Sequence, residues 1–184
     1  MIGAPIDADN LPEYYEKLCD LHTKHHKPEY ILVHDEIRQR LVGCESYTEM
    51  GVNQGATLAA AMLQHISCIR AYDFRLLPYL PAQHIFKEYA TTHSIDYDIF
   101  EIDTRKCSID RTDVLYIDTA HLYEQLSEEL RLHADKAQKY IICHDTHSEP
   151  DLKKAVNEFV ANNTNWSIVT DCTINVGFMT IKRT

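Results

Sequence analysis

The stretch Thr112–Thr146 constrains the fold more than any other part of this 184-residue chain. Two short apolar runs, Val114–Ile117 and Tyr140–Cys143, lie on either side of a segment of helical length with regularly spaced leucines. This pattern predicts a strand, a helix and a second strand. The polar residues that follow the two runs are Asp118 and His121, and then His144 and Asp145. In a parallel sheet both groups would lie at the same edge, where open α/β folds bind ligands.

The rest of the chain continues the alternation of strands and helices. Strands are expected over 47–50, 68–72 and 96–102, and helices over 57–65, 83–91 and 151–162. Two final apolar segments, 166–170 and 175–182, are separated by a short turn, which predicts an antiparallel hairpin. Alternation of this kind predicts an α/β fold in which helices cover both faces of a mostly parallel sheet.

Residues 1–46 form a polar lead-in with helical spacing over 11–21 and again over 31–41. The cluster His22, His25 and His26 has the residue type of a metal site, but no cysteine or fourth ligand accompanies it. A solvated helix end is the simpler interpretation. No basic start followed by an apolar core is present, so no signal peptide is expected.

Composition restricts the classes of function. A net charge of −10 disfavours nucleic acid as a partner, because binding its phosphate backbone requires clustered Lys and Arg. The same charge disfavours anionic membranes, and no apolar run is long enough to cross a bilayer. The six cysteines are scattered without a CxxC pair, which is typical of a protein of the reducing cytoplasm.

A glycine-containing segment, Glu49–Thr57, lies between an expected strand and an expected helix. Its spacing, ExGxxxG with Gly51 and Gly55, differs from both dinucleotide-binding and Walker loops. Glycines there allow a tight turn and a close approach of a ligand to the N–H groups of a helix N-terminus. The alternative is a turn that only connects the two elements.

Two further expected strands are each followed by a carboxylate. Asp73 follows the second strand, 68–72, and Asp103 follows the third, 96–102. A carboxylate at the end of the second strand is well placed to accept hydrogen bonds from ribose hydroxyls. Either residue could instead be an ordinary helix-capping or turn aspartate.

Asp118 and Asp145, at the ends of neighbouring strands, could hold a hard cation such as Mg²⁺. His121 beside them could remove a proton from a hydroxyl. In a simpler reading His121 and Asp145 only cap local structure. A metal-dependent hydrolase is a rival hypothesis, whose zinc or two-metal site would use the residues Asp118, His121, His144, Asp145 and His147.

These residues resemble the motifs of class I S-adenosylmethionine-dependent methyltransferases, in the branch with an IDxxHxYE…HDT signature. Here the signature reads Ile117–Glu124 and His144–Thr146, and Thr48–Thr57 is similar to the family's first motif. The resemblance covers about residue 47 to the C-terminus. It implies one methyltransferase-like domain over 1–184, with a helical lead-in over 1–46 and a Rossmann-like core over 47–184. That core would be a three-layer sandwich with a seven-stranded sheet.

The resemblance also implies roles for individual residues in methyl transfer to an oxygen of a small molecule or sugar. The cofactor side would comprise Glu49, Gly51 and Gly55 near the methionine portion of S-adenosylmethionine, Asp73 at the ribose, Asp103 near the adenine, and Asp118. Asp118 and Asp145 match aspartates that bind Mg²⁺ in members that require it. His121 matches a proposed general base, with Asp118 beside it at the catalytic centre.

The chain departs from the family pattern in two places. Where members often have IDGDH, this chain has Ala120 in place of the second acid, which removes one metal or substrate contact. This departure keeps a second alternative open, a non-catalytic cofactor-binding protein of the same fold. Because the lead-in is short, we expect the acceptor site either to be open or to be completed by another subunit. A homo-oligomer is compatible with the sequence.

Overall fold

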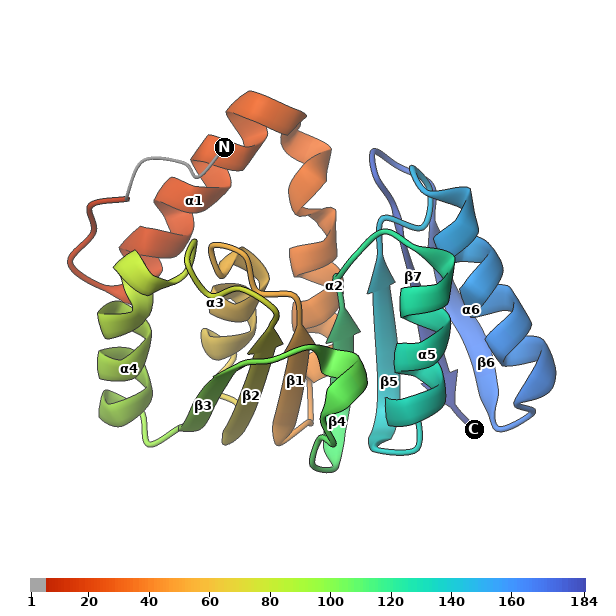
Figure 1. Ribbon diagram of the computed structural model, residues 1–184. Coiled ribbons are helices and arrows are strands. Elements are labelled where there is room, and N and C mark those ends of the chain that lie inside the picture. The colour runs from red at the N-terminus through yellow and green to blue at the C-terminus, as the bar shows by residue number, and fades with distance from the viewer. Residues whose placement is uncertain (1–5) are drawn as a thin grey trace.

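A computed structural model describes residues 6–184, apart from the side chain of His26, and places a central sheet between two layers of helices (Figure 1). The strands are β1 Ser46–Met50, β2 Cys68–Asp73, β3 Asp96–Glu101, β4 Thr112–Ile117, β5 Ala137–His144, β6 Trp166–Cys172 and β7 Phe178–Arg183. The α-helices are α1 Leu11–His26, α2 Leu32–Leu41, α3 Ala56–Met62, α4 Gln83–Thr92, α5 Tyr123–His133 and α6 Pro150–Asn162. Short 3₁₀ turns are η1 Pro28–Ile31, η2 Leu80–Ala82 and η3 Thr104–Lys106.

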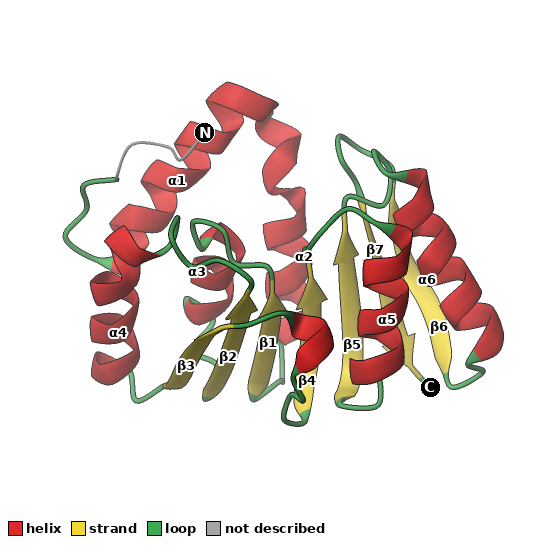
Figure 2. Cartoon of the chain, in the orientation of Figure 1, coloured by secondary structure: helices red, strands yellow, loops and turns green. Residues whose placement is uncertain are grey.

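The seven strands lie in the order β3-β2-β1-β4-β5-β7-β6. The first five strands of the chain pair in parallel, whereas β7 is antiparallel to both β5 and β6. The predicted Rossmann-like three-layer sandwich with a C-terminal antiparallel hairpin is therefore confirmed (Figure 2). The strand order reverses between β1 and β4, which creates a crevice at the carboxyl ends of these strands.

The pleat of β4 explains why its sequence is a continuous apolar run. Val114 and Tyr116 are buried in the core that contains residues of α1, α2, α3 and α4. Leu115 and Ile117 face the opposite way, into the core that contains residues of α5 and α6. Successive side chains of a strand point to opposite faces, so a strand covered on both faces must be apolar at every position.

The glycine loop brings the ends of β1 and β4 into close contact. The backbone N–H of Asp118 donates to the carbonyl of Met50 at 2.8 Å, and Gly51 has a φ of +89°. A Cβ at Gly51 would lie 1.8 Å from the carbonyl oxygen of Asp118, so no other residue fits without a shift of the backbone. Gly55, at φ +83°, begins α3 against the ring of Phe86.

The lead-in packs over the glycine loop. The side chain of Asn10 accepts a hydrogen bond from the backbone N–H of Glu13 and so starts α1. The phenol of Tyr14 donates to the carbonyl of Gln54 at 2.8 Å, which ties α1 to the loop. No helix among residues 6–184 combines the length and the apolar character needed to cross a membrane.

Replacing Gly51 by alanine is expected to destabilise the protein more than the same change at Gly43. Both glycines have positive φ, but a Cβ at Gly43 would have nothing within 4 Å. Gly43→Ala should therefore cost only the left-handed backbone conformation, about 1–2 kcal/mol. Gly51→Ala adds the clash with Asp118, and equilibrium unfolding in urea should show a clearly larger loss. Equal losses would contradict the proposed close contact of β1 and β4.

Candidate functional site

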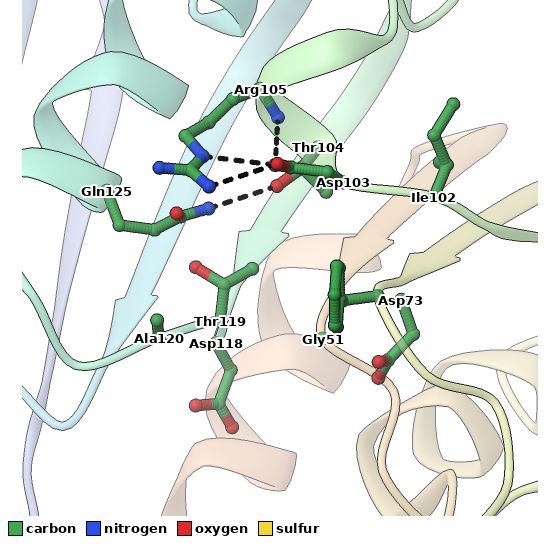
Figure 3. Close-up of a pocket in the computed structure, with 11 residues that line it drawn as sticks. Gly51, Asp73, Ile102, Asp103, Thr104, Arg105, Asp118, Thr119, Ala120 and Gln125 are labelled. Atoms are coloured by element: carbon green, nitrogen blue, oxygen red, sulfur yellow. Dashed lines mark hydrogen bonds and ion pairs between the residues drawn. The ribbon is translucent and has the colours of Figure 1, made fainter.

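Two cavities lie at the carboxyl edge of the sheet and have four lining residues in common: Gly51, Asp73, Asp118 and Thr119. The first, called here the Gln125 cavity, has a volume of about 360 Å³. Its other lining residues are Phe74, Ile102, Asp103, Thr104, Arg105, Ala120 and Gln125 (Figure 3). The second, the His144 cavity, has a volume of about 290 Å³. Its other lining residues are His22, Tyr30, Val33, His34, Val52, Asn53, Gln54, Ala56, Thr57, Tyr116, His121, His144 and Asp145.

Asp73, at the end of β2, holds the glycine loop. Its Oδ2 accepts the backbone N–H groups of Val52 at 2.6 Å and Asn53 at 3.0 Å, and its Oδ1 accepts that of Arg75 at 2.8 Å. Figure 3 shows the carboxylates of Asp73 and Asp118 on the two sides of Gly51. Asp73 lines both cavities, and a carboxylate has about four acceptor sites, so it can still accept bonds from a ligand.

Glu49 lies behind the glycine loop and is fully buried. Its carboxyl oxygens accept the phenol of Tyr47 at 2.6 Å and the hydroxyl of Thr57 at 2.9 Å. Burial raises the pKa of Glu49 to about 8, against the lowering effect of these two hydrogen bonds. The structure therefore places Glu49 as a support of the loop, and it lines neither cavity.

Asp103 lines the Gln125 cavity, and its carboxylate is hydrogen-bonded to the side chain of Arg105. The guanidinium Nε and one terminal nitrogen each lie 3.0 Å from a carboxylate oxygen, and the backbone N–H of Arg105 adds a third bond (Figure 3). The hydrogen bond from the Arg105 side chain lowers the pKa of Asp103 to about 2. Arg105 was not predicted from the sequence as a site residue.

The carboxylates and imidazoles that follow β4 and β5 converge in one cluster. Nε2 of His121 is 2.8 Å from Oδ2 of Asp145 and 3.7 Å from Oδ1 of Asp118. Nδ1 of His144 is 3.2 Å from Oδ2 of Asp118 and 3.4 Å from Oδ2 of Asp145. The proximity of these four side chains, expected from the strand ends, is confirmed.

Opposite charges balance within this cluster. Burial opposes charge on His144, but the carboxylates of Asp118 and Asp145 outweigh it and raise the pKa of the imidazole. Burial likewise opposes ionisation of Asp118, but His144 and His121 hold its pKa well below the usual range. Asp118 and Asp145 also raise the pKa of His121, which is about half exposed.

A metal ion could be held by one group of residues in the described part of the chain, Asp118, His121 and Asp145, whose ligand atoms all lie within 4.8 Å of one another. Two carboxylates suit a hard cation such as Mg²⁺, whereas an imidazole is more typical of transition metals. His147, which the hydrolase hypothesis included, is exposed and lines neither cavity.

The lead-in lines the His144 cavity, which differs from the expectation of a site with little cover. His22 of α1, Tyr30 of η1, and Val33 and His34 of α2 all line it. His22, of the predicted histidine cluster, thus lies toward the cavity, whereas His25 is exposed and the side chain of His26 lies outside the described structure. Local sequence could not reveal this, because helical spacing does not specify which end of the sheet a helix covers.

A buried carboxyl group on α5 organises the wall of the Gln125 cavity. Glu129 has no exposed surface and accepts hydrogen bonds from Thr104, Thr119 and Gln125, all of which line the cavity. Burial raises its pKa, although the three donors act in the opposite direction. The four-residue spacing of Gln125 and Glu129 was the available sequence signal, because it places both on one helix face.

Comparisons with solved structures identify the architecture. An O-methyltransferase from Bacillus cereus in complex with S-adenosylhomocysteine matches with a TM-score of 0.65 at 10% identity, over 98% of this chain and 94% of that one. The O-methyltransferase TomG from Streptomyces achromogenes, in complex with S-adenosylmethionine, matches with a TM-score of 0.59 at 14% identity, over 98% and 92%. The fold is that of class I methyltransferases.

A third structure with this methyltransferase fold is magnesium protoporphyrin IX methyltransferase (ChlM) from Synechocystis PCC 6803 with bound S-adenosylmethionine. It matches with a TM-score of 0.62 at 13% identity, over 86% of this chain and 81% of that chain. Neither the models of protein families nor the curated proteins gave a match to the sequence. At these identities the likeness establishes the fold alone.

Glu49→Gln is expected to change how stability depends on pH. With a pKa of about 8 in the folded protein and about 4.5 in the unfolded chain, Glu49 holds a proton in the fold that the unfolded chain has lost. Its contribution is fully present below pH 4.5 and is lost as pH rises through 8, with a slope of up to about 1.4 kcal/mol per pH unit. Glutamine cannot ionise, so urea unfolding from pH 5 to 8 should show a smaller decline in the variant. An unchanged decline would contradict the shifted pKa.

Proposed function

We propose that this protein is an S-adenosylmethionine-dependent methyltransferase that acts on an oxygen of a small molecule or sugar. The observation that carries the proposal is the junction of the two cavities at Gly51, Asp73, Asp118 and Thr119, in a sheet with the methyltransferase strand order. An elongated ligand lying across this junction would present its middle to the Asp118–His121–Asp145 group. A nucleoside in one cavity and an acceptor in the other would then meet there.

The Gln125 cavity suits the nucleoside. Asp73 offers carboxylate oxygens for ribose hydroxyls, a common use of an acid at this strand end. Phe74, of which 79% is exposed, and Ile102, 36% exposed, offer apolar surface for a planar base. Gly51 lines both cavities at the junction, where the methionine portion would pass into the second cavity.

The His144 cavity suits the acceptor. S-adenosylmethionine, when bound, supplies a methyl group that is already activated by the positive charge on sulfur. The protein then has mainly to align an acceptor oxygen with that methyl and to take the hydroxyl proton. The lead-in residues Tyr30 and His34 would close this side of the cavity and exclude water.

His121 is the proposed general base. Its Nε2 lies 2.8 Å from Oδ2 of Asp145, and donation of an N–H to that carboxylate would orient the ring and leave Nδ1 to take a proton from the acceptor. Asp145 and Asp118 would stabilise the imidazolium that forms. Asp118 and Asp145 are also the residues we propose to hold Mg²⁺ where it is required, and a bound cation would lower the pKa of the acceptor hydroxyl.

The proposed cofactor is tested by isothermal titration calorimetry with S-adenosylmethionine and S-adenosylhomocysteine, each with and without Mg²⁺. We expect both nucleosides to bind, and a matched titration of Asp73→Asn should show weakened binding, because a charged acceptor of the ribose hydroxyls is lost. Absence of binding by either nucleoside would contradict the proposed function. Binding without methyl transfer to any acceptor of a broad panel would instead favour a non-catalytic cofactor-binding protein.

His121→Ala is expected to reduce turnover by ~10²–10⁴-fold, the usual contribution of a general base, while the affinity for S-adenosylhomocysteine changes little. Release of S-adenosylhomocysteine measures turnover, and calorimetry measures affinity. The matched control is His147→Ala, which changes an exposed histidine near the same strand end and should leave both quantities unaltered. A parallel fall of turnover and affinity in His121→Ala would show that His121 acts on the cofactor and not as the base.

A further inference from the structure

The side-chain amide of Gln125 is held in one orientation at the wall of the Gln125 cavity. Its Nε2 donates to Oε1 of Glu129 at 2.6 Å and to the hydroxyl oxygen of Thr104 at 3.3 Å. The two acceptors lie side by side, because the Thr104 hydroxyl itself donates to Oε1 of Glu129, and together they hold the nitrogen end of the amide on the Glu129 side. The amide oxygen is the acceptor that this side chain offers to a ligand, and Figure 3 shows the nitrogen turned toward Thr104.

Glu129 enforces this orientation. An ionised carboxylate can only accept, and this one receives the hydroxyls of Thr104 and Thr119 as well as the Gln125 amide. Rotating the amide by half a turn would bring its oxygen against the carboxylate oxygen and would leave a buried acceptor unsatisfied, which is costly. The ring nitrogen Nε2 of His133 lies 2.8 Å from the carbonyl of Thr104 and so fixes η3, which carries that hydroxyl, to α5.

The neighbouring acid at this rim is already engaged. Both carboxylate oxygens of Asp103 receive the Arg105 guanidinium. Asp103, for which the family resemblance implies a place near the adenine, therefore has a strong donor of its own. Gln125 lines the same cavity, and its hydrogen bonds to other side chains of residues 6–184 use the amide nitrogen and leave the amide oxygen as an acceptor.

We propose that Gln125 determines the base specificity of the cofactor site by accepting a hydrogen bond from the exocyclic amino group of a 6-aminopurine. The inference rests on the proposed function and adds to it the recognition of adenine. A purine with a carbonyl oxygen in place of the 6-amino group would bring that oxygen against the amide oxygen of Gln125. Both atoms are acceptors, so such a purine would be rejected. Glu129 and Thr104 are positioning residues, because they act only through the orientation of Gln125.

The test compares two probes that differ at this one group, S-adenosylhomocysteine and its deaminated form S-inosylhomocysteine. Calorimetry should show that the wild-type protein binds the adenosyl compound roughly tenfold or more tightly, the usual effect of an unpaired buried acceptor. Gln125→Met, of similar length but without the amide, should bring the ratio of the two dissociation constants close to one. A merely structural role would weaken both ligands alike and leave the ratio unchanged.

Two variants of Glu129 separate orientation from packing. Glu129→Gln can keep an oxygen facing Gln125 and donate its own amide to the Thr119 hydroxyl, so the wild-type ratio should persist. Glu129→Met removes the acceptor, and the ratio should fall. Thermal unfolding establishes that each variant is folded, and the Gln125→Met result stands alone should Glu129→Met fail to fold.

Three outcomes would overturn the inference. Equal affinity of the wild-type protein for the two nucleosides would remove base selectivity altogether. A wild-type ratio retained in Gln125→Met would assign the selectivity to another residue. Failure of both nucleosides to bind would overturn the proposed function itself, and this outcome is distinguishable because the first two require binding.

Discussion

The close contact between the ends of β1 and β4 is the constraint on which the rest of the site depends. Gly51 passes directly over the carbonyl of Asp118, while its own N–H donates to the carbonyl of Tyr72 on β2. Three parallel strands are thereby joined at one point of the sheet edge. The loops that leave this point diverge, because the strand order reverses between β1 and β4. One cavity lies on each side of it, and Gly51 and Asp118 line both.

The polar residues of the site are arranged so that few charges lack a partner. Asp118 and Asp145 lie against two imidazoles, and Asp103 lies against a guanidinium. Asp73 accepts three backbone N–H groups, and the buried Glu49 accepts two hydroxyls. A buried carboxylate without such partners would be costly. The acids of this edge therefore shape the backbone and the neighbouring side chains as well as offering oxygens to a ligand.

Much of the fold could be predicted from the sequence, because its signals are local. Continuous apolar runs such as Val114–Ile117 indicate strands covered on both faces, and the final two segments indicate a hairpin. The convergence of Asp118, His121 and Asp145 could also be predicted from the sequence, since parallel strands end at one edge. The order of the strands could not be predicted in this way, because each crossover can place the next strand on either side of the sheet without a change in the local pattern.

The parts of the site that the sequence did not reveal depend on packing between distant segments. Arg105 and Gln125 become neighbours only because η3 packs against α5, and the lead-in covers the His144 cavity only because α1 and α2 cross above the glycine loop. The complete burial of Glu129 is a property of the folded chain, which its position in a helix does not indicate. The roles of these residues thus require three-dimensional information.

The most direct test of this account is a crystal structure of the protein with S-adenosylhomocysteine. We predict that the ligand lies across both cavities, with its ribose hydroxyls at Asp73, its base between Ile102 and Gln125, and its sulfur near Asp118 and Thr119. The acceptor side of the His144 cavity, bounded by His121 and Tyr30, would remain open to a second molecule. A ligand confined to one cavity, or bound away from the carboxyl edge of the sheet, would contradict the account.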